Sequence, residues 1–195
     1  MLRRTSHVKH GCSLLRKGLA ALVTLVWQAL LPAQATTLAR MDVAQLTAHS
    51  TAVARVRCIS SAVRIDPSGV WTVTTFEVSD VWKGSLPATV SVRLPGGRAG
   101  GLVVHVDGAP RFVPGEEAVL FLEPVGNREV TITSWAQGTF RIARSCSSPV
   151  EEATQDTAEL CVLNSGTGRP GAGGRRRIPV ARLRAEVERA AWRQP

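Results

Sequence analysis

A two-residue alternation of side chains is clearest in VWTVTTFEVSDV, residues 70–81. The even-numbered positions of this stretch carry one of the two alternating sets of side chains: Val70, Thr72, Thr74, Phe76 and Val78. Because successive side chains of an extended chain point to opposite faces, this pattern is typical of a β-strand with one buried face. The sequence DPSG, residues 66–69, has the composition of a hairpin turn. Residues 52–63, which precede the turn, are therefore predicted to form the first strand of the hairpin.

Further short strands follow along the chain, each bounded by residues that favour turns. The predicted strands are residues 89–94, 102–106, 118–123, 129–134 and 138–143. The segment 118–123 is nearly continuous in apolar character, so it is predicted to be covered on both faces. Six or seven short strands with little helix between them predict a mainly β protein. An antiparallel sandwich and a partly closed barrel both fit this pattern.

Two helical segments are predicted at the ends of the β region. Residues 40–50 carry apolar side chains at helical spacing and predict a short amphipathic helix. Near the C-terminus Pro179 opens a second helix, in which Leu183, Val187 and Ala190 or Ala191 recur at helical spacing. The apolar stripe of this second helix is narrow, which predicts weak docking on the β region or on a partner.

Residues 1–35 have the composition of a signal peptide. Five basic residues and no acidic residue lie before or beside an apolar run over residues 19–31, and Ala33 and Ala35 follow it. Cleavage is expected between Ala35 and Thr36. The alternative is an uncleaved membrane anchor, but the run is shorter than the roughly 20 residues that a membrane-spanning helix needs. We therefore expect an extracytoplasmic protein, periplasmic or secreted, with no stable transmembrane segment after cleavage.

Charge is distributed unevenly along the rest of the chain. The whole sequence has a formal net charge of +9, but residues 36–195 hold 19 basic and 15 acidic residues, a net charge of +4. Residues 165–195 contain eight arginines and two glutamates, which leaves residues 36–164 with 11 basic and 13 acidic residues. The β region is therefore nearly neutral, and its charge does not indicate a nucleic-acid-binding surface.

These composition changes divide the sequence into five parts. They are a signal peptide (1–35), a short helical lead-in (36–50), a β-barrel domain (51–164), a linker rich in glycine and arginine (165–177) and a C-terminal helix (178–195).

Three cysteines remain after the signal peptide, and export would expose them to an oxidising compartment. Cys146 and Cys161 enclose a polar, acidic stretch, so a disulfide between them would constrain an otherwise flexible excursion. Cys58 is in phase with Ala54 and Val56 and is expected to be a buried free thiol. The other two pairings stay open.

Few residues of this sequence lie in a pattern that is typical of a catalytic or metal-binding site. The segment 36–195 has only His49 and His105, and it lacks the histidine and cysteine spacings of the usual zinc sites. No metal site, no cofactor and no catalytic residue is predicted. His105 and Asp107 share a strand face at i, i+2 and form a candidate pair for a small hydrolase. No serine lies in a Gly-x-Ser-x-Gly elbow.

A glycine-rich loop, residues 95–101, interrupts two of the predicted strands. It lacks the Gly-Lys-Ser/Thr ending of a phosphate-binding loop, and a strand rather than a helix follows it, so a flexible or bulged hairpin is expected. The loop would shape one rim of a barrel. The candidate ligand-contact residues around that rim are Trp71, Arg98, His105 and Arg111.

Three stretches carry a resemblance to known proteins: FEVSDVWKG (76–84), PGG (95–97) and GAPRFVPGEEAVLFL (108–122). The chain resembles uncharacterised secreted bacterial proteins with an OB-like β-barrel. It is more distantly similar to the netrin-like modules of tissue inhibitors of metalloproteinases. The resemblance covers residues 52–142 and implies a small antiparallel OB-like barrel of five to seven strands. Its motifs are turn and core patterns, which are nearly silent on function.

The inhibitor mechanism of the tissue-inhibitor relatives needs an N-terminal cysteine that chelates the zinc of the protease. The expected mature terminus here is Thr36-Thr37-Leu38, so this mechanism is not available to the chain.

Three function classes remain. The leading hypothesis is a non-catalytic extracytoplasmic binding or interaction module, with a protein or glycan partner in the cell envelope and no nucleic acid. The second is an inhibitor or accessory subunit of an exported enzyme, with residues 96–101 in its contact surface. The third is a small hydrolase that uses His105 and Asp107.

Overall fold

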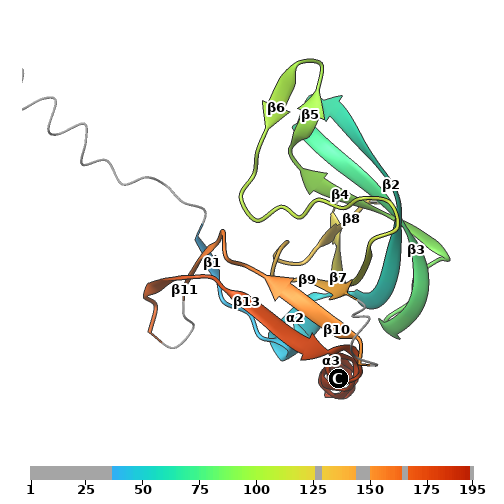
Figure 1. Ribbon diagram of the computed structural model, residues 1–195, viewed down its shortest axis with the longest axis vertical. Helices are drawn as coiled ribbons and strands as arrows, with labels where there is room; N and C mark the ends of the chain where they lie inside the picture. Colours follow the sequence, from blue (N-terminus) through green and yellow to red (C-terminus); the bar gives the residue numbers. More distant parts are fainter. Residues whose placement is uncertain (1–36, 126–128, 144–149, 164–166, 194–195) are drawn as a thin grey trace, which may run out of the picture. The chain divides into compact units, whose positions relative to one another are not determined.

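The computed structural model describes residues 37–125, 129–143, 150–163 and 167–193. This part of the chain is mainly β and contains two helices, α2 (Val43–His49) and α3 (Val180–Trp192) (Figure 1). The predicted signal peptide and its cleavage site lie outside the described residues. Neither α2 nor α3 has the length and apolar character that a membrane-spanning helix needs.

The largest sheet has eight strands in the order β13-β10-β9-β7-β2-β3-β4-β8. The bounds of these strands are β2 (Ala52–Asp66), β3 (Gly69–Lys83), β4 (Thr89–Pro95), β7 (Glu117–Val125), β8 (Glu129–Ile132), β9 (Thr139–Ala143), β10 (Glu152–Asp156) and β13 (Arg175–Pro179). The predicted hairpin is present, since β2 and β3 pair antiparallel from Asp66↔Gly69 to Val53↔Lys83, with register shifts along the way. Figure 1 shows β9, β10 and β13 side by side.

Five strands of this sheet also pair in a ring. Antiparallel pairs join β7 to β2, β2 to β3, β3 to β4 and β7 to β8. The last step, between β4 and β8, is parallel and consists of a single residue pair, Val92↔Val130. With one residue pair at this junction, the sheet is not closed into a clear barrel.

Two smaller sheets complete the β structure. One has the order β1-β11-β12 and consists of β1 (Thr37–Ala39), β11 (Cys161–Leu163) and β12 (Pro170–Ala172). The other is a hairpin of β5 (Gly97–Ala99), which lies in the glycine-rich loop, and β6 (Leu102–Val104), which lies in the predicted strand 102–106. Gly100 and Gly101 form its tip, and both have a positive φ, a conformation that favours glycine.

Side chains of β2 and β7 alternate between two hydrophobic cores. Ala54 and Leu120 belong to a first core with Phe76. Val53 and Phe121 belong to a second core, which lies on the other face of the same strands. Every side chain of β7 from Ala118 to Leu122 is buried, so the prediction that this strand is covered on both faces is confirmed.

The two helices cover the second core. Helix α2 begins with a capping box between Asp42 and Gln45 and buries Leu46 completely. At its C-terminal end the ammonium group of Lys83 donates to the carbonyl oxygens of Thr47 and Ser50, at 2.6 and 2.7 Å. Helix α3 follows Pro179, as predicted.

The docking of α3 differs from the sequence prediction. Val180, Leu183 and Val187 are all buried in the second core, and Leu183 and Val187 have no exposed surface. A narrow apolar stripe is enough for docking because Phe121, Phe140 and Ile178 contribute apolar side chains to the same core. The prediction of weak docking is therefore wrong.

The C-terminal third contains more regular structure than its sequence predicts. Strand β10 lies within the stretch expected to be a flexible excursion, and β12 and most of β13 lie within the range expected to be a linker. Both β10 and β13 are polar, with Ala153 and Ile178 as their buried apolar side chains. Backbone pairing to the edge of β9 orders them, and this contribution leaves no periodic signal in the sequence.

Cys58 is a buried free thiol, as predicted, and burial raises its pKa. Cys161 is a half-buried free thiol. Cys146 lies outside the described residues, so the disulfide between Cys146 and Cys161 stays a prediction.

Candidate functional site

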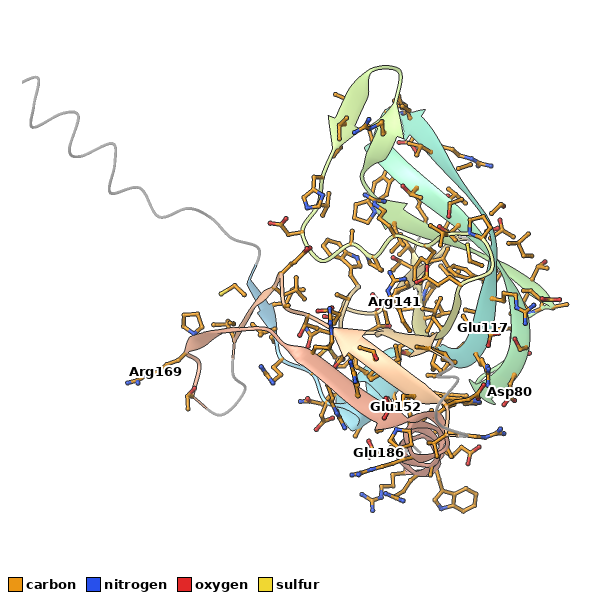
Figure 2. The ribbon with its side chains drawn as sticks, in the orientation of Figure 1. Asp80, Glu117, Arg141, Glu152, Arg169 and Glu186 are labelled. Atoms are coloured by element: carbon orange, nitrogen blue, oxygen red, sulfur yellow. The ribbon has the colours of Figure 1, made fainter. Side chains whose placement is uncertain are left out.

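A polar cleft of about 410 Å³ lies between the loop of residues 105–111 and the sheet edge formed by β9, β10 and β13. Four basic side chains line it: His105, Arg111, Arg141 and Arg175. Asp156 and Glu159 also line it. Figure 2 shows Arg141 on β9, where this sheet faces the loop. We use the term cleft for this cavity and the residues that line it.

Arg141 joins the sheet to the loop. Its Nη2 atom donates to the carbonyl oxygen of Arg111 at 2.6 Å, and its Nη1 atom pairs with the carboxylate of Glu116. The guanidinium also lies 4.8 Å from the ring centroid of Phe112. Burial lowers the pKa of Arg141, although Asp156 partly opposes this shift. An arginine stays charged even so, and Arg141 therefore places a fixed, largely neutralised cation on the cleft wall.

Arg111 extends from the loop towards the ends of β3 and β4. Its Nη1 atom donates to Thr72 Oγ1 at 2.7 Å and to the carbonyl oxygen of Gly96 at 3.1 Å. Its Nη2 atom donates to the carbonyl oxygen of Pro95 at 3.0 Å. All three acceptors are neutral, and partial burial lowers the pKa of Arg111. Within the described residues, no carboxylate lies within ion-pair distance of this guanidinium.

The opposite wall of the cleft is held by contacts between β10 and β13. Arg175 donates to Asp156 Oδ2 from both Nε and Nη2, at 2.9 and 2.6 Å. These hydrogen bonds, together with one from the backbone N–H of Ala158, lower the pKa of Asp156. Beyond this pair, Thr157 Oγ1 donates to the carbonyl oxygen of Gly174 at 2.9 Å. The charge of Arg175 is thus matched by a carboxylate, whereas that of Arg111 is not.

His105 and Asp107 do form a pair, with 3.2 Å between Nε2 and Oδ1. The two side chains are 75% and 58% exposed, so water screens the interaction and gives it little strength. The hydroxyls that line the same cleft belong to threonines. Two of them donate to backbone carbonyls, Thr139 to Trp135 and Thr157 to Gly174. This arrangement supplies no activated nucleophile among the described residues of the cleft.

The structure brings together only part of the predicted rim. His105 and Arg111 line the cleft, whereas Trp71 and Arg98 do not. Arg98 is exposed on β5. The ring of Trp71 instead stacks on the guanidinium of Arg93, 4.0 Å from the ring centroid, on the outer face of β3 and β4.

Sequence reasoning missed Arg141 and Asp156, and it assigned Arg175 to the linker of residues 165–177 rather than to a site. Arg141 lies in a short strand whose pattern concerns the core, and Asp156 and Arg175 lie in segments read as irregular. The three residues become neighbours of the loop only through the pairing of β9, β10 and β13. No local signal in the sequence could have identified them.

The described residues contain no group of three or more histidine, cysteine, aspartate or glutamate side chains that could hold a metal ion. No protein-family model matches the chain, and no curated protein matches it either.

Proposed function

We propose that this protein is a non-catalytic, extracytoplasmic binding module that holds an anionic group of its ligand in the cleft. The observation that carries the proposal is that Arg111, which lines a cleft of about 410 Å³, pairs with no carboxylate among the described residues. A guanidinium that donates only to neutral acceptors gains a charge-assisted hydrogen bond when a carboxylate or sulfate arrives. The imidazole of His105 lies at the same cleft and offers a further hydrogen-bonding group.

The proposed architecture is an OB-like barrel of β2, β3, β4, β7 and β8. Its support is the ring of strand pairs, in which each of these five strands has two neighbours. The resemblance of residues 52–142 to secreted bacterial proteins and netrin-like modules agrees with this assignment. OB-like folds bind oligosaccharides as well as nucleic acids, so the fold suits an anionic glycan of the envelope. The composition of residues 1–35 supports the extracytoplasmic location.

The test uses a sulfated dextran oligosaccharide as the anionic probe and the unsulfated oligosaccharide of the same length as its control. Binding is measured by isothermal titration calorimetry at low ionic strength. Arg111→Gln is expected to weaken binding of the sulfated probe by about tenfold or more, since it removes a charge-assisted hydrogen bond. Arg111→Lys keeps the charge without the guanidinium fork. Its affinity for the sulfated probe is expected to lie between those of the wild-type protein and Arg111→Gln.

Arg98→Gln is the matched control, because Arg98 is exposed and lies outside the cleft. It is expected to change the affinity by no more than about twofold. The arginines of residues 175–193 would also attract an anionic probe, so the test is the difference between the two variants. Equal losses from Arg111→Gln and Arg98→Gln, or equal binding of the unsulfated oligosaccharide, would contradict the proposal. Circular dichroism shows whether each variant is folded.

A second candidate function is inhibition or support of an exported enzyme, and the β5–β6 hairpin favours it. Leu102 and Val103 are 50% and 58% exposed on β6, which is unusual for two adjacent apolar side chains. If the hairpin contacts an enzyme, Val103→Asp should abolish capture of that enzyme from an envelope extract, because a buried carboxylate would be unpaired. Capture that is unchanged by Val103→Asp would rule the hairpin out as the contact surface.

A further inference from the structure

One face of helix α3 points away from the second core. We define the outer face of α3 as Arg182, Ala185, Arg189, Trp192 and Arg193, which recur at spacings of three and four residues. All five are exposed, whereas Val180, Leu183 and Val187 point into the core. The helix has 13 residues and is therefore about 20 Å long, so the outer face forms an extended, gently convex surface.

This surface carries an excess of positive charge. Residues 175–193 contain seven arginines and two glutamates, a net charge of +5. Glu186 lies between two arginines, 3.1 Å from Arg182 and 3.7 Å from Arg176. Within the described residues, neither Arg189 nor Arg193 has a carboxylate within ion-pair distance. No described carboxylate therefore competes by ion pairing with an external anion at these two guanidinium groups.

Arg184, on the flank of the helix, differs from Arg189 and Arg193 because carboxylates pair with it. It pairs with Glu188 and with Asp80 of β3, at 2.7 Å in each case. Figure 2 labels Asp80 and Glu186 in this region. Asp80, Glu186 and Glu188 thus pair with Arg176, Arg182 and Arg184, and this leaves the positive charge of the outer face concentrated towards its C-terminal end.

Trp192 lies at that same end and is 90% exposed. A fully exposed indole leaves a large apolar surface in water. Its neighbours on the outer face are arginines and an alanine, so it has no apolar surroundings that could form the dry centre of a protein interface. An indole among cations is instead the composition found at the headgroup level of a bilayer, where tryptophan places its ring in the apolar layer and its N–H near water.

A groove between α2 and α3 adds to this surface. It measures about 420 Å³, and Arg176, Arg189 and Arg193 line it together with Ala44 and Ala48. Two carboxylates also line it, but each is occupied. Asp42 accepts from the backbone N–H of Gln45, and Glu186 pairs with arginine. Small side chains and unmatched guanidinium groups leave room for a lipid phosphate group.

We propose that the outer face of α3 binds the surface of a bilayer that contains anionic phospholipid. Arg189 and Arg193 would pair with headgroup phosphates, and Trp192 would insert its ring between the headgroups. The apolar stripe of α3 stays in the core, so the attachment is peripheral and reversible. This surface is separate from the cleft, and the proposal does not depend on the proposed ligand of the cleft.

The experiment is co-sedimentation of the protein with vesicles of phosphatidylcholine and phosphatidylglycerol, compared with vesicles of phosphatidylcholine alone. We expect binding to the anionic vesicles only, with a strong decrease at high salt. The double variant Arg189→Gln/Arg193→Gln should weaken binding by about 25-fold, since each basic residue near an anionic surface contributes about fivefold. Trp192→Ala should weaken it by about tenfold, through lost burial of the ring.

The matched control is Arg98→Gln/Arg169→Gln, which removes two exposed arginines from other elements and should leave binding within about threefold. Tryptophan emission should shift to shorter wavelength on anionic vesicles, and this shift should vanish in Trp192→Ala. If the two double variants weaken vesicle binding equally, net charge alone explains the binding. That result would overturn the assignment of the binding surface to the outer face of α3.

If the emission shift is absent and the protein binds soluble polyglutamate as tightly as the anionic vesicles, the surface would instead be assigned to an acidic polypeptide. Arg111→Gln should not change vesicle binding, so failure here is distinguishable from failure of the cleft proposal.

Discussion

Replacement of Phe112 by alanine is expected to lower the free energy of unfolding by about 3 kcal/mol and to weaken anion binding in the cleft. Phe112 is 5% exposed, and its ring packs edge-on against Phe76 with 5.0 Å between the ring centroids. The ring also lies 4.8 Å from the guanidinium of Arg141. Phe112 therefore anchors the loop that carries Arg111 to the first core, and its loss would free that loop from the cleft.

Urea denaturation followed by circular dichroism measures the stability change, and calorimetry with the sulfated probe measures binding. Val113→Ala is the matched control, because the adjacent Val113 is 65% exposed and its truncation should change stability by less than about 0.5 kcal/mol. If Phe112→Ala fails to fold, Phe112→Leu keeps much of the volume while it removes both ring contacts. Wild-type stability in Phe112→Ala, or probe binding that is unaffected in the folded variant, would show that the loop is held by other contacts.

Leu183→Ala is expected to lower the free energy of unfolding by about 3 kcal/mol. Leu183 has no exposed surface and packs in the second core with Val187 and Phe121. Because the truncated side chain lies between α3 and the sheet, the cavity can close only by moving the helix. A stability loss of this size would mean that α3 is part of the cooperative fold and not an appendage.

The measurement is the midpoint and slope of urea unfolding. Trp192→Ala on the same helix is the control, since its exposed ring should contribute less than about 0.5 kcal/mol. An unchanged midpoint for Leu183→Ala would restore the prediction of weak docking. A separate, earlier transition for the helix would mean that α3 unfolds on its own.

Local pattern was sufficient for the strands of residues 52–143. The alternation around Phe76 placed its own face correctly, since Val70, Thr72, Thr74 and Phe76 are all buried in β3. The continuous apolar run in β7 correctly indicated cover on both faces. These successes have one cause: a strand that is half or fully buried must show its burial in its own side chains.

The side-chain pattern does not identify a strand that is ordered by backbone pairing alone. β10 and β13 have little apolar content, and their order comes from hydrogen bonds to β9 and to each other. The strength of α3 docking was also misjudged, because it depends on the surface that the sheet offers to Leu183. Neither property is encoded within the segment itself.

The positions of most strands between residues 52 and 143, the hairpin at Asp66 and the helix after Pro179 could be derived from residue order, because each depends on neighbours within a few positions. The cleft could not. It joins residues 105–111 to Arg141, Asp156 and Arg175, which meet only when the two polar strands β10 and β13 add to β9 at one edge of the sheet. Contacts between residues so distant along the chain are set by long-range strand pairing and core packing, and these exist only in the folded molecule.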